Sequence, residues 1–125
     1  MRILLDSHTL IWWMDDPSIL KPAAKAAISD PTNEVFASSV SIWELGLKVS
    51  KAKLRLPHGF EKRLWDDGIQ PLSFTPAHAV HSIELPPIHG DPFDRALVAQ
   101  CLSESLTLAT RDDLLANYGV SVMAV

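Results

Sequence analysis

The chain has 125 residues, of which 47% are hydrophobic and 21% charged, with a net charge of −4 and a single cysteine. This mixture is typical of a globular protein, and the length predicts one domain over residues 1–125. The lone Cys101 excludes an intramolecular disulfide and a multi-cysteine metal cluster, and its apolar neighbours predict a core residue in a reducing compartment. No apolar stretch reaches the ~18 residues of a membrane span, so we expect a soluble, cytoplasmic protein.

The acidic balance argues mildly against nucleic-acid binding, because proteins that bind phosphate backbones are usually basic. The charge is uneven, however. Residues 48–63 carry six basic side chains and only one acidic one, Glu61. This basic stripe is either a solvated surface or a surface that contacts phosphates, and the sequence leaves both interpretations open.

The first half of the chain alternates strand and helix patterns. RILLD predicts a buried strand over 2–6, and a helix follows over 7–14, for which Asp6 or Ser7 is a suitable cap. Further elements are a helix over 19–30, a strand over 34–39 and an amphipathic helix over 39–53.

The second half continues the alternation. A helix over 60–68 ends at Gly68, and a strand over 70–75 is expected near a sheet edge because of Pro71. Then come a helix over 76–85, a helix over 91–105 capped by Asp91, a strand over 106–110, a helix over 111–119 and a strand over 120–125. This order predicts a three-layer α/β/α fold with a mainly parallel sheet of about five strands.

Several acidic residues fall where such a sheet would bind a ligand. Asp6 ends the first strand, Asp112 follows the fourth, and Glu44 and Asp94 lie on helices beside them. Ligands bind outside the carboxyl ends of parallel strands, where the strand order reverses. Because clustered carboxylates repel unless a cation joins them, the pattern indicates an oxygen-rich site for Mg²⁺ or Mn²⁺.

Each acid also has a purely structural interpretation. Asp6 suits a helix cap, and Glu44 precedes Lys48 by four residues, which favours an ion pair. Asp91 is predicted to act only as an N-cap, and Asp94 gains from the helix dipole without any metal. Spacing alone leaves the structural and metal-binding interpretations open.

Four segments in order resemble the PIN-domain proteins of the VapC toxin type, from bacterial toxin–antitoxin pairs. They are LLDSHTLIWW, SSVSIWELGLKVSKAKL, HGDPFDRALVAQ and LATRDDLL. The resemblance covers nearly the whole chain and implies a PIN-like fold with Mg²⁺- or Mn²⁺-dependent endoribonuclease activity, in which activated water hydrolyses RNA. It implies catalytic roles for Asp6, Glu44, Asp94 and Asp112, with Asp6, Asp94 and Asp112 as metal ligands.

The same resemblance implies further contacts and partners. Thr110, and Ser39 or Ser41, match hydroxyls near the metal or substrate, and Lys48 is placed to meet the scissile phosphate. A homodimer and a VapB-type antitoxin, whose tail enters an apolar groove next to the acids, are also implied. The pair Trp12 and Trp13 on one short helix indicates such a groove, because this helix is not expected to bury both side chains. His8 and His89 are candidates for RNA or leaving-group contacts, without a general-acid role assigned to either.

Two other functions remain open from the sequence. One is a non-catalytic PIN-like binding module, in which the acids are only caps and ion pairs. The other keeps the metal chemistry but applies it to RNA or DNA processing, since specificity lies in surface detail around a shared site.

Overall fold

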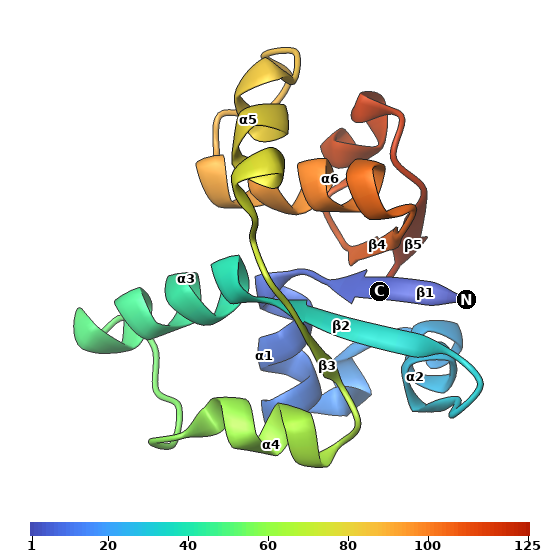
Figure 1. Ribbon diagram of the computed structural model, residues 1–125. Coiled ribbons are helices and arrows are strands. Elements are labelled where there is room, and N and C mark those ends of the chain that lie inside the picture. The colour runs from blue at the N-terminus through green and yellow to red at the C-terminus, as the bar shows by residue number, and fades with distance from the viewer.

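The computed structural model describes residues 1–125 and contains one five-stranded parallel sheet in the order β3-β2-β1-β4-β5 (Figure 1). The strands are β1 (Arg2–Leu5), β2 (Glu34–Ser38), β3 (Gln70–Leu72), β4 (Thr107–Thr110) and β5 (Val122–Ala124). The helices are α1 (Ser7–Asp15), α2 (Pro22–Ser29), α3 (Ser39–Ser50), α4 (Phe60–Asp66), α5 (Pro76–Glu84) and α6 (Pro92–Glu104), with 3-10 helices η1 (Pro17–Ile19) and η2 (Asp113–Tyr118). No helix is long and apolar enough to cross a membrane.

Helices cover both faces of the sheet because alternate strand residues point to opposite sides. Ile3 and Leu5 of β1 pack in one core cluster with residues of α1, α2 and α4. Leu4 packs in a second cluster with residues of α6 and η2. Figure 1 shows α5 and α6 on one side of the sheet and α1, α2 and α4 on the other. The predicted three-layer α/β/α fold is therefore confirmed.

The predicted element bounds need several corrections. The first strand ends at Leu5, because Asp6 already serves as the N-cap of α1. The helix expected over 19–30 is divided into η1 and α2, with Pro22 at the start of α2. The helix expected to reach residue 53 ends at Ser50, and the predicted 70–75 strand keeps only three residues. The last predicted helix is a 3-10 helix. The edge position of the Pro71 strand is confirmed.

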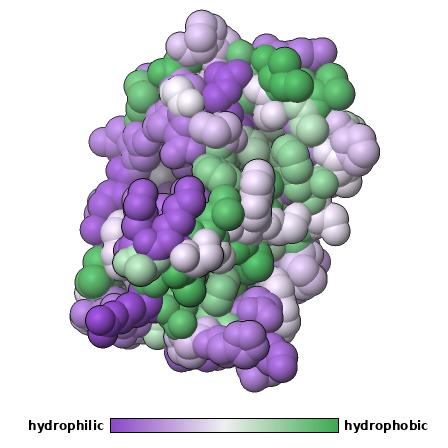
Figure 2. Space-filling view, turned by 90° about the vertical axis from the view of Figure 1, so that its left-hand side faces the viewer, coloured by the Kyte–Doolittle hydropathy of each residue, from purple (hydrophilic) through white to green (hydrophobic).

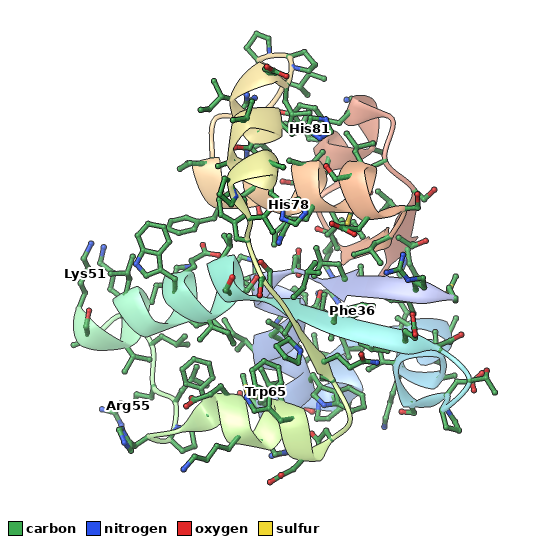
Figure 3. The ribbon with its side chains drawn as sticks, viewed as in Figure 1. Phe36, Lys51, Arg55, Trp65, His78 and His81 are labelled. Carbon is green, nitrogen blue, oxygen red and sulfur yellow. The ribbon has the colours of Figure 1, made fainter.

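Three of the four tryptophans lie against the core. Trp12, Trp13 and Trp65 are half-buried beside the first core cluster, whereas Trp43 on α3 is 62% exposed. Figure 3 shows Trp65 on α4, below the sheet. Cys101 is buried as predicted, and burial raises the pKa of its thiol to about 12.

His78 and His81 of α5 both contact α6. Figure 3 shows His78 and His81 on α5, facing α6. His78 is buried and completes the N-terminal capping box of α5, while its Nε2 lies 2.9 Å from Glu104 of α6. His81 Nδ1 lies 2.9 Å from the Ser103 hydroxyl. The pair therefore joins two helices.

Candidate active site

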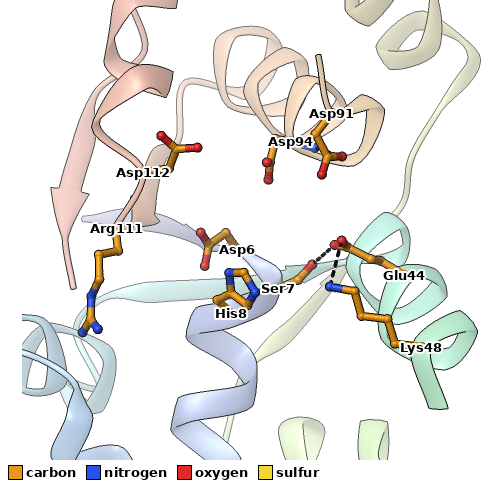
Figure 4. A pocket seen from close by; sticks show the side chains of 9 residues that line it. All are labelled: Asp6, Ser7, His8, Glu44, Lys48, Asp91, Asp94, Arg111 and Asp112. Carbon is orange, nitrogen blue, oxygen red and sulfur yellow. Dashed lines mark hydrogen bonds and ion pairs between the residues drawn. The ribbon is translucent and has the colours of Figure 1, made fainter. Parts of the chain in front are cut away.

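A polar pocket of about 140 Å³ lies where the carboxyl ends of β1 and β4 meet (Figure 4). These two strands are neighbours, and the strand order reverses between them, so this edge is the expected ligand-binding crevice. The lining contains no hydrophobic residue and consists of Asp6, Ser7, His8, Glu44, Lys48, Asp91, Asp94, Arg111 and Asp112. Five carboxylates thus face two cationic side chains.

Asp6 is both a helix cap and a pocket residue. Its Oδ1 accepts hydrogen bonds from the backbone N–H of Thr9 at 2.8 Å and from the Thr9 hydroxyl at 2.6 Å. No hydrogen bond within the chain uses Oδ2. A carboxylate has two oxygens, so capping α1 leaves the second oxygen available in the pocket. The structural and metal-binding interpretations of Asp6 are therefore compatible.

The same dual arrangement recurs at two other helix starts. Asp91 Oδ1 caps α6 by accepting from Phe93 N–H at 2.8 Å, as predicted, and Asp112 Oδ1 caps η2 by accepting from Leu114 N–H at 3.0 Å. Three helical N-termini consequently converge on the pocket. Their partial positive charges stabilise nearby carboxylates and help to explain how so many acids gather there.

Asp94 lies in the first turn of α6, and the pKa of its carboxyl group is raised above the usual value. Burial, followed by the negative charge of Asp91, raises its pKa to about 6, with smaller contributions from Asp6 and Glu44. His89 acts in the opposite direction. Ionised Asp94 is therefore unfavourable without a counter-charge, which is the condition that a bound cation relieves.

Glu44 reaches the pocket from α3. It is nearly buried and accepts a hydrogen bond from the Ser7 hydroxyl, while its other oxygen lies 3.5 Å from Lys48 Nζ. The predicted ion pair with Lys48 is confirmed. Ser7 was considered only as an alternative helix cap, but it joins the start of α1 to α3 inside the pocket.

Asp112 makes two polar contacts in addition to its cap of η2. Its backbone N–H donates to the Thr110 hydroxyl at 3.1 Å, and its Oδ2 lies 2.9 Å from His89 Nε2. One ring nitrogen of His89 and one carboxylate oxygen each of Asp94 and Asp112 lie within 4.8 Å of one another. The structure thus brings together two acids that are 18 residues apart in the sequence.

Arg111 lines the pocket and forms no ion pair with the carboxylates there. Its guanidinium donates to the carbonyl oxygens of Val125 at 3.1 Å and Ile19 at 3.0 Å, and it lies 4.2 Å above the Trp12 ring. The His8 ring stacks on the same tryptophan. With five carboxylates and two cationic side chains, the pocket carries more acidic than basic groups.

Of the predicted substrate-contacting residues Lys48, Thr110 and Ser39, only Lys48 lines the pocket. Lys48 lines the pocket, whereas Thr110 is buried behind it and supports Asp112. Ser39 is not part of the pocket: its hydroxyl accepts from Phe74 N–H at 2.9 Å, and it lines a hollow with Trp43 and Trp65. Its placement does not support a contact at the acidic edge. Ser41 is buried, and its hydroxyl has no hydrogen-bond partner.

The donor set fits a hard divalent cation. Asp6, Asp94 and Asp112 offer carboxylate oxygens around one polar pocket, and such ligands suit Mg²⁺ or Mn²⁺. Burial first, and then the charge of Asp91, raise the pKa of Asp94, so a cation beside this carboxylate would favour its ionised form. The arrangement can therefore hold a metal ion and present it to a phosphate.

The parallel sheet carries a pocket of carboxylates where its strand order reverses. These two features place the chain among α/β proteins with an acidic site suited to a cation. The family model of the PIN domain matches residues 3–120, and the chain belongs to the PIN-domain family. The resemblance inferred from the four sequence segments is thereby confirmed.

Individual relatives agree with this assignment. The chain is 29% identical to Ribonuclease VapC22 of Mycobacterium tuberculosis (strain ATCC 25618 / H37Rv) over 119 residues, covering 93% of this chain and 91% of the relative. The fold is similar to that in a structure of VapBC2 from Rickettsia felis bound to a promoter DNA fragment, with TM-score 0.74, 16% identity and coverage of 99% and 98%. A DNA-bound VapBC from Salmonella typhimurium gives TM-score 0.67, 15% identity and coverage of 99% and 98%.

Proposed function

We propose that this protein is a Mg²⁺- or Mn²⁺-dependent endoribonuclease and the toxin of a type II toxin–antitoxin pair. The observation that carries the proposal is the convergence of Asp6, Glu44, Asp94 and Asp112 on one polar pocket with more acidic than basic groups. Membership of the PIN-domain family and similarity to a ribonuclease and to VapBC complexes support it.

In this proposal Asp6, Asp94 and Asp112 hold the metal. A bound divalent ion would stabilise charge on the phosphate and lower the pKa of water so that it attacks the phosphodiester. Asp6 presents Oδ2 while Oδ1 remains in the α1 cap, so its orientation is fixed before the metal binds. Glu44, held by Ser7 and Lys48, is placed to orient the attacking water.

The RNA strand is proposed to leave the pocket along the lysine-rich end of α3. A neighbouring hollow of about 410 Å³ shares Glu44, Lys48 and Asp91 with the acidic pocket and adds Lys51 and Lys53. Lysines at this position would bind phosphates on either side of the scissile bond and offset the negative pocket. This assignment uses only Lys48, Lys51 and Lys53 of the basic stripe between residues 48 and 63, at and just after the end of α3.

The proposal also includes a homodimer, a VapB-type antitoxin and a cytoplasmic location. An apolar hollow near the edge strand is lined by Ile42, Trp43, Trp65 and Leu72, among others, and would accept apolar side chains of a partner segment. Figure 2 shows that the molecular face on the side of α3 and α4 has hydrophobic residues running between hydrophilic ones.

Metal binding and RNA cleavage test the proposal together. Calorimetry with Mn²⁺ should show binding to the wild type and loss of binding in Asp94→Asn. The control is Asp113→Asn, which should bind Mn²⁺ normally, because Asp113 is exposed and lies outside the pocket. Cleavage of single-stranded RNA should require Mg²⁺ or Mn²⁺ and disappear in Asp6→Asn and Asp94→Asn. Unchanged cleavage by these variants would refute the assignment.

A further inference from the structure

His89 is held by three polar contacts at the edge of the acidic pocket. Its backbone N–H donates to the Tyr118 hydroxyl at 2.8 Å. Its ring Nδ1 accepts the backbone N–H of Asp91 at 3.0 Å, and its Nε2 lies 2.9 Å from Asp112 Oδ2 and 3.6 Å from Asp94 Oδ2. The ring thus stands between two of the proposed metal ligands.

These contacts determine which ring nitrogen carries the proton. The Asp91 amide can only donate, so Nδ1 must present its lone pair. In neutral histidine the proton is then on Nε2, which donates it to the Asp112 carboxylate. An Nε2 that carries a proton has no lone pair for a metal ion, so His89 cannot be a ligand while the Asp91 contact is intact.

We propose that His89 is a positioning residue that holds the Asp112 carboxylate toward Asp94 by donating from Nε2, and that it is not itself a metal ligand. Its effect on the metal rests on the function proposed above. Outer hydrogen bonds of this type orient metal-binding carboxylates and commonly change metal affinity by about 10–100-fold when removed.

The loop that carries His89 is itself fastened to the fold. The Arg95 guanidinium donates to the carbonyl oxygens of Ser82, Leu85 and Pro86 at 2.9–3.0 Å and to the Tyr118 hydroxyl at 3.1 Å. Tyr118 in turn accepts the His89 amide. The imidazole is therefore placed by α6 and η2 together, the two elements that also carry Asp94 and Asp112.

Two substitutions separate the two ring contacts. His89→Gln places an amide donor near the Nε2 position and so keeps a donor for Asp112, but it loses the acceptor for Asp91. His89→Asn places a carbonyl acceptor near the Nδ1 position for Asp91 and loses the donor for Asp112. Both proteins are checked for native circular dichroism before Mn²⁺ affinity is measured by calorimetry.

The proposal expects the Asn variant to bind Mn²⁺ about 10–100-fold more weakly than the wild type, while the Gln variant keeps most of the affinity. The opposite order, with Asn retaining affinity and Gln losing it, would show that His89 acts only by shaping the loop. Pulsed electron paramagnetic resonance of the Mn²⁺-loaded wild type should show no directly coordinated imidazole nitrogen. Detection of one would overturn the proposal.

A measurement on metal-free protein keeps this inference separate from the proposed function. Long-range ¹H–¹⁵N correlation at pH 8 should show the His89 ring with its proton on Nε2. A proton on Nδ1 would refute the hydrogen-bond assignment even if Mn²⁺ binds. If wild type failed to bind Mn²⁺ and cleave RNA, the proposed function would fail, while this spectrum would still decide the histidine's bonding.

Discussion

Replacing Asp94 by Asn should stabilise the metal-free protein at pH 8. The folded-state pKa of Asp94 is about 6, against a usual value of 3.8. The folded protein therefore holds this proton more tightly than the unfolded chain, and its stability falls as the pH rises from 3.8 through about 6. At ~1.4 kcal/mol per pH unit, the ionised carboxylate costs about 3 kcal/mol at most.

Two effects reduce this figure. The Asp94 side chain is 27% exposed, so water offsets part of the cost of ionising its carboxyl group. The carboxylate also interacts favourably with the N-terminus of α6, which Asn would give up at a cost of ~0.3–1 kcal/mol. We therefore expect Asp94→Asn to raise the free energy of unfolding by about 1–2 kcal/mol at pH 8.

Urea unfolding in EDTA measures this difference, with Asp113→Asn as the control for removing an exposed charge nearby. The stabilisation by Asp94→Asn should shrink at pH 4.5, where wild-type Asp94 is largely protonated in the folded state. Saturating Mn²⁺ should stabilise only the wild type, by ~2.7 kcal/mol at a hundred times the Kd. An Asp94→Asn protein no more stable than wild type at pH 8, or a difference independent of pH, would refute the argument that burial and neighbouring carboxylates disfavour ionised Asp94.

Three further predictions concern the rest of the fold and site. The double variant Lys51→Glu, Lys53→Glu should have a higher KM for RNA and an unchanged affinity for Mn²⁺. An unaltered KM in steady-state kinetics would show that RNA does not bind along these lysines. The Arg95→Lys variant cannot reproduce the planar set of donors to three carbonyl oxygens and Tyr118, so its free energy of unfolding in urea should fall by about 1–3 kcal/mol. An unchanged unfolding midpoint would show that Arg95 does not stabilise the loop that carries His89. The Cys101 thiol, buried and with a pKa of about 12, should react with a disulfide reagent only after unfolding, and rapid labelling of the native protein would show that the core opens at α6.

The order and types of elements were predictable because they depend on local pattern. Apolar runs of strand length alternated with amphipathic helices, and this alternation specifies a parallel sheet covered on both faces. Element ends were less predictable, because a carboxylate such as Asp6 can be read either as the last strand residue or as a cap. The capping hydrogen bond from the Thr9 N–H to Asp6 Oδ1 decides between them.

The sequence by itself determined which acids were available, that Asp6 would lie at the carboxyl end of a strand and that Asp112 would follow another. Only the tertiary structure decided what those acids contact. Ser39 turned toward the edge strand because of its position at the start of α3, since neighbouring helical residues point about 100° apart. His89 acquired its place between Asp94 and Asp112 because α6 and η2 pack together on the same face of the sheet. Distances between residues far apart in sequence arise from packing, and no local pattern records them.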